Sequence, residues 1–193
     1  MARYIKVKLK TLQKYDLAPA EASIRRKNKI QTRKSAYGER LDQKQKLKII
    51  YGVMEGQMKR YVREAFNSQG DPQLELLKKL EMRLDNVAYR LGYGKTRSQA
   101  RQLVNHGHVL VNDKKVDIPS YLLKIGQTIS LRKKTLNKRN FSETIENNRK
   151  TLTSVSYLDY KKDSGVFVSL PAKDDLAQNV DISKVMEFYR NII

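Results

Sequence analysis

Five nitrogen-bearing side chains lie close together near the middle of the chain, and their types and spacing suit the binding of phosphate. They are Lys95, Arg97, Arg101, His106 and His108. Arg97 and Arg101 are four residues apart, which in a helix places their Cβ atoms about 5–6 Å from each other on one side. Guanidinium groups offer N–H donors in a fixed plane that matches phosphate oxygens. The spacing predicts an RNA-contacting helix face, with a merely solvated surface helix as the alternative.

Two helices, a tight turn and a β-hairpin must position these side chains. Gly92 directly follows the first helix, where a left-handed cap favours glycine. Thr96 and Gln99 have the spacing of a capping box, which predicts that the second helix begins there and ends at Gly107. Apolar residues at steps of three and four predict one continuous first helix with a buried face: Leu74, Leu77, Leu80, Leu84, Val87, Ala88 and Leu91.

The segment after the second helix favours RNA over DNA as the ligand. Asn112 and Asp113 separate Val109-Leu110-Val111 from Lys114-Lys115-Val116, as in a two-residue hairpin turn whose central residues have positive φ. A helix-turn-helix DNA-binding protein is the competing interpretation. A hairpin that follows the second helix directly makes that interpretation weaker.

The stretch RLDNVAYRLGYGKTRSQARQLVNHGHVLVN, residues 83–112, resembles the RNA-binding module first described in small-subunit ribosomal protein S-four. The module also occurs in some tRNA synthetases and pseudouridine synthases, so the flanking segments carry the more specific resemblance. These flanks are similar to that ribosomal family in the same order along the chain: ARY (2–4), KQKLKIIYGVMEGQM (44–58), GVFVSLPAKDDL (165–176) and VMEFYRN (185–191). The chain is identified as a member of the S-four family over most of its length.

The resemblance implies an α+β fold in which a helical N-terminal domain is completed by the C-terminal tail. An RNA-binding module of two helices and a small antiparallel sheet is inserted between these parts. The expected boundaries are a basic arm over residues 1–40, a helical domain over 41–77 with 180–193 packing back on it, and the module with its sheet over 78–179. Many relatives have an N-terminal cysteine cluster that binds zinc and a Pro-Gly-Gln-His-Gly turn, and this chain has neither.

The resemblance also implies a function. The protein would be a structural constituent of the small ribosomal subunit that binds ribosomal RNA early, at a five-way junction. It would contact neighbouring small-subunit proteins and lie near the channel where messenger RNA enters, affecting decoding accuracy and unwinding of the messenger. Arg33, Lys34 and Arg40 are the candidates for messenger contact. We expect a cytoplasmic ribosome, with an organellar ribosome as the alternative.

The candidate RNA-binding residues are basic side chains on the arm, the predicted helices and the hairpin. They are Arg3, Lys8, Arg25, Arg26, Arg33, Lys34, Arg40, Lys44, Lys48, Lys59, Arg60, Arg63, Arg90, Lys95, Arg97, Arg101, His106, His108 and Lys114.

The charge is distributed unevenly, which supports a polyanion as the partner. The chain has 40 Lys and Arg against 20 Asp and Glu, a net charge of +20. Residues 1–40 hold 12 basic and 3 acidic side chains and residues 72–134 hold 13 and 5, whereas residues 151–193 hold 5 and 6. A scaffold with incidental charge would bind RNA almost independently of salt. A free-standing regulatory RNA-binding factor remains the second alternative.

Other function classes find little support in the sequence. There are no cysteines, and no phosphate-cradling glycine loop, nucleophile elbow or zinc-protease motif is present. We therefore expect no enzyme activity, cofactor or metal. No apolar run reaches the roughly 18–20 residues of a membrane span, and we expect neither a membrane partner nor a homo-oligomer.

Further expectations concern the elements around the module. The apolar spacing over residues 42–66 predicts one long helix with Asp42 as its cap. Gly52 and Gly56 inside it suggest a close backbone approach by RNA or another helix. Residues 154–160 and 166–170 are predicted to be strands, with the apolar residues of the second on one face: Val166, Val168 and Leu170.

Overall fold

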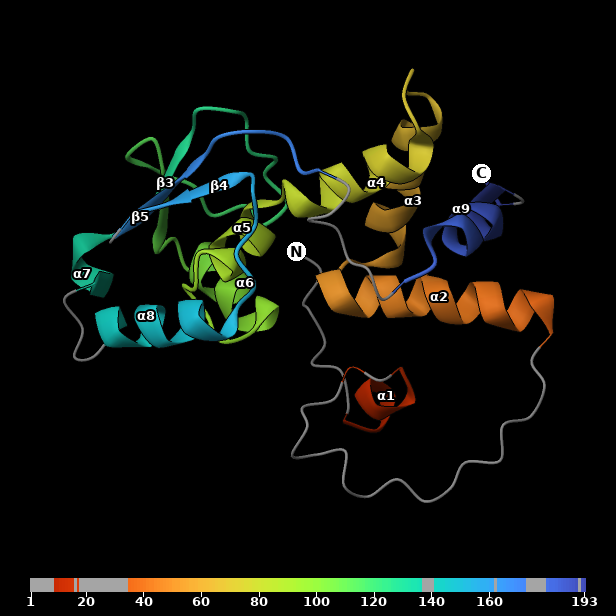
Figure 1. The fold of residues 1–193 in the computed structure, drawn as a ribbon, viewed down its shortest axis with the longest axis horizontal. Coiled ribbons are helices and arrows are strands. Elements are labelled where there is room, and N and C mark those ends of the chain that lie inside the picture. Colours follow the sequence, from red (N-terminus) through yellow and green to blue (C-terminus); the bar gives the residue numbers. More distant parts are fainter. Residues whose placement is uncertain are drawn as a thin grey trace. The chain divides into compact units, whose positions relative to one another are not determined.

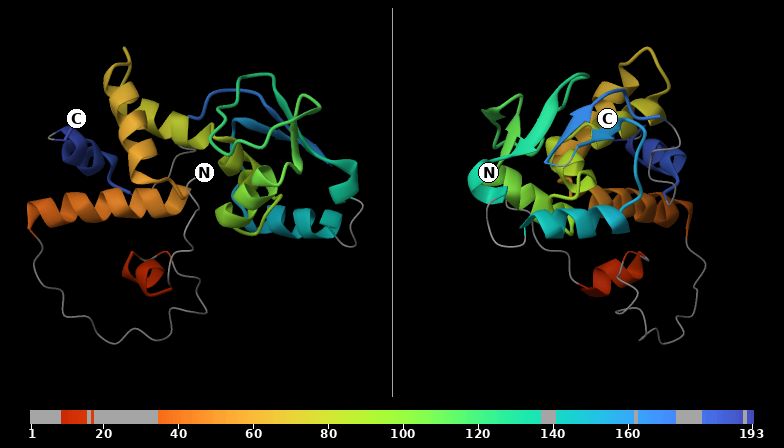
Figure 2. Two further views of the ribbon diagram at one scale, coloured as in Figure 1. Left: turned by 180° about the vertical axis from the view of Figure 1, so that it is seen from behind. Right: turned by 60° about the vertical axis from the view of Figure 1, so that its left-hand side comes forward.

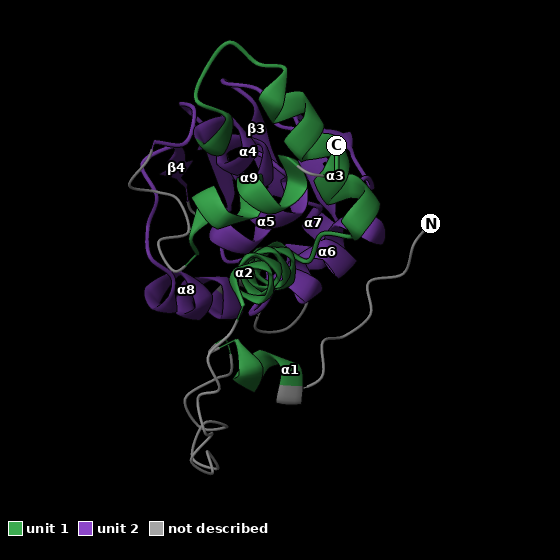
Figure 3. Cartoon of the chain, turned by 90° about the vertical axis from the view of Figure 1, so that its right-hand side faces the viewer, with its two compact units in different colours: residues 1–73, 178–193 green, residues 74–177 purple. Residues whose placement is uncertain are grey.

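The computed structural model describes residues 9–15, 17, 35–136, 141–161, 163–172, 180–190 and 192–193. The chain forms two compact units, shown in different colours in Figure 3. Unit 1 takes in residues 1–73 and 178–193, and unit 2 takes in residues 74–177. The helices and the antiparallel sheet confirm the α+β class (Figure 1).

Unit 1 is helical among the residues that the structure describes. Its helices are α1 (Leu9–Lys14), α2 (Ala36–Tyr51), α3 (Glu55–Phe66) and α9 (Ile182–Arg190). α2 begins after Ser35, whose side-chain oxygen accepts a hydrogen bond from the Gly38 N–H at 3.2 Å. The predicted cap at Asp42 and the start of the helix near residue 42 are therefore wrong, because α2 begins six residues earlier, at Ala36.

The predicted continuous helix over residues 42–66 is also wrong. α2 ends at Gly52, which has φ +62° and donates its N–H to the carbonyls of the last turn. Such a conformation stops a helix, and glycine adopts it without steric cost. A Cβ on Gly56 would meet nothing within 4 Å, so no described part of the chain approaches that glycine closely, and an approach by RNA stays a prediction.

Helix α9 packs against α2 and α3, as the resemblance predicted for the C-terminal tail (Figures 1 and 2). Val185 and Tyr189 of α9 are fully buried. The Tyr189 hydroxyl donates a 2.8 Å hydrogen bond to Glu55 of α3. Sequence-distant residues thus complete one apolar core in unit 1.

Unit 2 combines helices with a five-stranded antiparallel sheet in the order β2-β1-β3-β5-β4. Its helices are α4 (Pro72–Glu81, which starts in unit 1), α5 (Leu84–Arg90), α6 (Arg97–Asn105), α7 (Lys133–Leu136) and α8 (Phe141–Thr151). Its strands are β1 (Val109–Val111), β2 (Lys114–Lys115), β3 (Thr128–Leu131), β4 (Leu158–Tyr160) and β5 (Ser164–Phe167).

One core lies between the helices and the sheet. Side chains on α5, on α6 and on one face of β1, β3 and β5 belong to it. Ile145 of α8 is only 2% exposed and belongs to the same core. The buried apolar residues of α5, α6 and the strands are Leu84, Val87, Ala88, Ala100, Val104, Val109, Val111, Ile129, Leu131, Leu158 and Phe167.

The first helix of the module is divided in two, contrary to the prediction. Arg83 is extended and forms an isolated β-bridge with Leu122. The Leu84 N–H bonds to the Tyr121 carbonyl and the Asp85 N–H to the Pro119 carbonyl. These bonds replace the helical ones across residues 82–83, so the apolar spacing continues while the helix does not.

Other local predictions are confirmed. Gly92 has φ +80°, and a Cβ there would lie 2.9 Å from Arg149 Cγ. Thr96 Oγ1 accepts from the Gln99 N–H at 3.2 Å, although Gln99 returns its bond to the Lys95 N–H, at 2.8 Å, and not to Thr96. Asn112 and Asp113 have φ of 48° and 62° in the hairpin turn.

The last two strands are shorter than predicted, and β5 buries the opposite face. Phe167 is fully buried, and Gly165 lies so close to Leu91 that a Cβ would overlap its side chain. Val168 and Leu170 fall outside the strand and are 44% and 46% exposed. The alternation of valines was misleading because a glycine and a phenylalanine occupy the inward positions.

Candidate RNA-binding surface

Arg97 opens α6 and is held against α5 by two contacts. Its Nε donates a 2.8 Å hydrogen bond to the side-chain oxygen of Asn86. Its guanidinium carbon lies 4.5 Å from the centroid of the Tyr89 ring, within the range of a cation–π contact. The plane of the guanidinium is therefore set by residues of α5.

Arg101, one turn further along α6, shares a carboxylate with a buried arginine. Arg83 is 1% exposed and binds Asp85 in a bidentate manner, with Nε at 3.0 Å and Nη2 at 2.6 Å. Arg101 Nη1 lies 3.4 Å from the same Oδ2 atom, and its side chain is 19% exposed. A bidentate pair fixes the carboxylate in place, so Asp85 offers Arg101 a rigid partner.

Glu81 is the centre of a second set of buried polar contacts. It is fully buried at the end of α4 and accepts hydrogen bonds from the Tyr157 hydroxyl at 2.7 Å and from the Asn86 amide at 2.5 Å. Arg90 Nη2 lies 3.2 Å from its other oxygen. A buried carboxylate without partners costs several kcal/mol, so this set of contacts explains how the charge is tolerated.

The remaining candidates of the module lie around the end of α6 and on the hairpin. The rings of His106 and His108 have centroids 6.2 Å apart. Thr135 Oγ1 lies 3.0 Å from His108 Nδ1, whereas His106 is exposed. Lys95 and Lys114 are both exposed. The structure thus places Arg97 and Arg101 one turn apart on α6, where both contact residues of α5. The predicted histidines lie at the other end of α6.

In unit 1, the structure argues against Lys44 as an RNA ligand. The sequence placed it on the polar side of its helix, but Lys44 is 6% exposed and its Nζ lies 4.4 Å from the Phe188 ring centroid. Lys44 and Lys48 both bind Glu55, at 3.3 and 2.6 Å. Partial burial acts to raise the pKa of Glu55, but hydrogen bonds from Lys48 and Tyr189 and the charge of Lys44 outweigh it and hold that pKa below its ordinary value.

The other unit 1 candidates are more accessible. Arg40 pairs with Glu187 of α9 at 2.9 Å. Arg60 is exposed and lies 3.8 Å from Glu64 one turn away. Arg63 is exposed and Lys59 is half-buried. The candidates of the N-terminal arm lie outside the described residues: Arg3, Lys8, Arg25, Arg26, Arg33 and Lys34.

Sequence reasoning missed the acidic and amide side chains beneath the arginines. Glu81, Asp85 and Asn86 were not singled out, and Arg83 was passed over although it is one of the most buried large side chains. The available signal was the spacing of Arg83 and Asp85, two residues apart around a helix start. That spacing alone does not show that both residues are buried.

Two other kinds of site have no counterpart in the part of the chain that the structure describes. Among those residues, no group of three His, Cys, Asp or Glu side chains is placed to hold a metal ion. None of the helices that the structure describes is long and apolar enough to cross a membrane.

A helix pair with a row of guanidinium groups, backed by an antiparallel sheet, is an arrangement that suits an RNA-binding protein. The family model for the S4 domain matches residues 82–129, and the model for the ribosomal protein S4/S9 N-terminal domain matches residues 3–81.

Curated relatives agree with these two matches. Small ribosomal subunit protein uS4 of Acholeplasma laidlawii (strain PG-8A) is 42% identical over 184 residues, covering 93% of this chain and 87% of the relative. The uS4 proteins of Persephonella marina (strain DSM 14350 / EX-H1) and Sulfurihydrogenibium sp. (strain YO3AOP1) are 43% and 47% identical. The first match covers 94% of this chain and 88% of the relative, and the second covers 80% and 77%. The chain belongs to the uS4 family of small-subunit ribosomal proteins.

Proposed function

We propose that this protein binds small-subunit ribosomal RNA early in assembly and organises a junction of several RNA helices. The observation that carries the proposal is the row of arginines on α5 and α6, each held by a buried acid or amide. Pre-oriented cations lower the repulsion between phosphates where RNA helices converge. RNA helices are recognised mainly through shape and backbone, because side chains enter their major groove poorly.

The wider assignment draws on the family. Neighbouring small-subunit proteins are the expected protein partners, and the protein acts without catalysis. Its place near the channel where messenger RNA enters, and its effect on decoding accuracy, rest on the family resemblance. Arg40 is the described candidate for messenger contact, from its place near the start of α2. The relatives come from bacteria, which supports a cytoplasmic ribosome.

Sedimentation of native lysate tests the ribosomal assignment. The protein should stay with small subunits and whole ribosomes on a sucrose gradient after a high-salt wash. Release by the wash, or sedimentation near the top, would instead identify a dissociable RNA-binding factor.

Binding to a transcript of small-subunit ribosomal RNA tests the proposal that basic side chains bind phosphates. With about eight phosphate contacts, the affinity should fall by roughly 10³–10⁵ between 50 and 200 mM salt, by analogy with duplex DNA. An affinity that does not change with salt would indicate a scaffold with incidental charge.

A further inference from the structure

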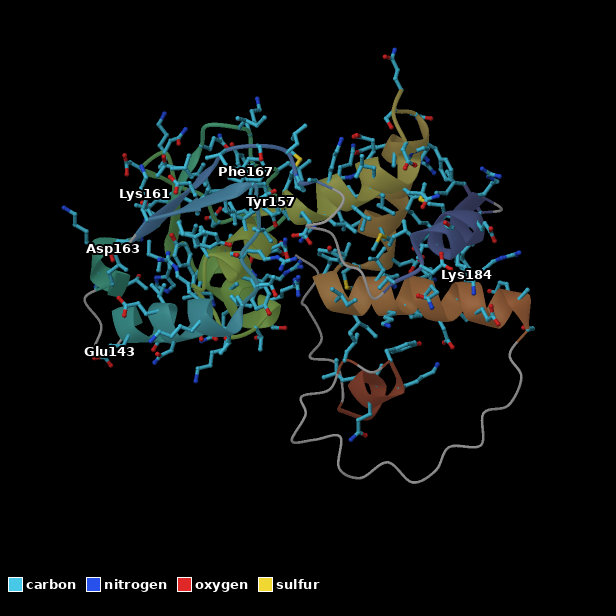
Figure 4. All side chains as sticks on the ribbon, viewed as in Figure 1. Glu143, Tyr157, Lys161, Asp163, Phe167 and Lys184 are labelled. Atoms are coloured by element: carbon cyan, nitrogen blue, oxygen red, sulfur yellow. The ribbon has the colours of Figure 1, made fainter. Side chains whose placement is uncertain are left out.

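Four polar side chains are buried in unit 2 directly behind the arginines of α5 and α6. Glu81, Asp85, Asn86 and Tyr157 are at most 4% exposed. Figure 4 labels Tyr157, which lies next to Phe167 with ring centroids 5.6 Å apart. Buried polar groups destabilise a protein unless each finds a partner, so their partners are held in defined places. Here those partners include three of the proposed RNA-binding arginines.

Asn86 links the buried acid to the first arginine of α6. Its Nδ2 donates both to Glu81 Oε2 and to the Glu81 carbonyl, at 2.5 and 3.2 Å. An ionised carboxylate can only accept hydrogen bonds, so the amino end of the amide must face Glu81. The amide oxygen is thereby aimed at Arg97 Nε, 2.8 Å away.

Glu81 is fixed from two further sides. Tyr157 donates its hydroxyl to one carboxylate oxygen and Arg90 reaches the other. One buried carboxylate therefore holds Arg90 directly and Arg97 through Asn86. A guanidinium has five N–H donors, so one that binds the protein along one edge can still bind phosphate along another.

From this geometry we infer that Glu81 and Asn86 are positioning residues for RNA binding. They set the orientation of Arg90 and Arg97 before RNA arrives, which reduces the conformational entropy that these side chains lose on binding. The inference rests on the proposed function, since it takes the same arginines as ligands of ribosomal RNA. It adds that their affinity depends on two residues that do not touch the RNA.

A double-mutant cycle between Asn86 and Arg97 tests this inference. Wild type, Asn86→Ala, Arg97→Ala and the double variant are each bound to a transcript of small-subunit ribosomal RNA at several salt concentrations. We expect Asn86→Ala to weaken binding about three- to tenfold, the scale of one hydrogen bond. Its salt dependence should stay unchanged, because the number of charges is the same.

The other two variants carry the decisive comparison. Arg97→Ala should weaken binding and reduce the slope of log affinity against log salt by about 0.7–0.9, the value for one phosphate contact. The double variant should bind no more weakly than Arg97→Ala, because Asn86 acts through Arg97. Additive losses, or a folded Asn86→Ala protein that binds like wild type, would overturn the inference.

Asn148→Ala is the matched control. Asn148 is also a buried asparagine of unit 2, 7% exposed, but its amide holds the Gly92 carbonyl at 2.9 Å. It should lower the melting temperature and leave the affinity of the folded protein unchanged. An equal loss of affinity in this variant would mean that general loosening of unit 2 explains the effect.

Arg97→Lys keeps the test informative if Asn86→Ala fails to fold. It retains the charge but loses the Nε donor and the planar group over Tyr89. We expect weaker binding with an unchanged salt slope, and binding equal to wild type would overturn the inference. Weak, salt-independent binding by the wild type would instead reject the proposed function, so the two failures can be told apart.

Discussion

Both units pair cations with a carboxylate, but the charges lie at opposite depths. In unit 1, the Lys44 side chain is 8% exposed while its partner Glu55 is 35% exposed. In unit 2, Arg90 is 14% and Arg101 19% exposed, above acids that are 0% and 5% exposed. The cation is the inner partner for Lys44 and the outer partner for Arg90 and Arg101, while Arg83 of unit 2 is as deeply buried as the acid that it shares with Arg101.

This difference shows that a row of basic residues on a helix does not by itself define a nucleic-acid surface. The sequence placed Lys44 and Arg97 in the same candidate class. When the acid is the more buried partner, the cation lies nearer the solvent. When the cation is the more buried partner, as Lys44 is, it becomes part of the core. The planar guanidinium also suits the outer role, because it can bind two partners along different edges.

The largest effect is expected for Glu81→Ala, which removes the buried acid of unit 2. Arg90, Asn86 and Tyr157 would each lose a partner, and breaking a buried ion pair from one side costs about 3–5 kcal/mol. Hydrogen exchange followed by mass spectrometry should show faster exchange in peptides spanning 84–111. Protection equal to wild type there would show that the acid is not needed for stability.

The double variant Arg97→Ala with Arg101→Ala should affect both binding and stability. RNA binding should weaken by about 1–3 kcal/mol for each charge-assisted hydrogen bond to phosphate that the variant removes. The free energy of unfolding should fall by only about 1–2 kcal/mol, because Arg83 still pairs with Asp85. Filter binding and thermal unfolding measure the two quantities. A large stability loss with unchanged affinity would make the pair structural, like Lys44 in unit 1.

Glu55→Gln tests the arrangement in unit 1, where the acid is the outer partner. The quantity to follow is the free energy of unfolding as a function of pH. The folded-state pKa of Glu55 lies below the ordinary 4.5, so its charged form stabilises the protein above pH 4.5, and this stabilisation is lost as the pH falls through the lowered value. At pH 7 we expect a loss of about 1–2 kcal/mol, since the carboxylate is partly screened by solvent.

Urea unfolding of Glu55→Gln and of wild type, repeated over a series of pH values, measures this effect. The difference between Glu55→Gln and wild type should shrink as the pH falls below 4.5. A difference that stays constant down to pH 3 would contradict the assignment of this stabilisation to the Glu55 charge.

Arg60→Ala should have the smallest effect on stability. The side chain is exposed and its 3.8 Å pair with Glu64 lies one turn away on the same helix, an arrangement worth about 0.5 kcal/mol or less. If Arg60 binds phosphate, the salt slope should still fall by about 0.7–0.9. An unchanged slope would remove Arg60 from the candidate set.

Local sequence signals predicted much of unit 2 because their causes are local. Gly92, the Thr96 cap and the Asn112–Asp113 turn each depend on a backbone conformation that few residue types adopt. The same reasoning failed over residues 42–66 and 74–91, where apolar spacing continued through a break. At Gly52 the break comes from a left-handed cap, and at Arg83 from hydrogen bonds to residues 119–122.

The arginines of the candidate site could be predicted from the sequence. The buried residues that hold them in place could not. Arg97 and Arg101 could be found from spacing because neighbouring turns of a helix share a face. The pairing of Glu81 with Tyr157 joins residues 76 positions apart, and no local pattern reports such a contact. The burial of Lys44 likewise depends on α9, which lies at the other end of the sequence.

The discontinuous make-up of unit 1 has a consequence for biosynthesis. Unit 2 is one uninterrupted stretch of sequence, whereas unit 1 needs α9, which is synthesised after all of unit 2. Domains generally fold in the order in which they leave the ribosome, so we expect unit 2 to acquire its structure while unit 1 still waits for α9. A chain cut short by a premature stop codon just before α9 would retain the arginine face but leave the apolar sides of α2 and α3 exposed to solvent.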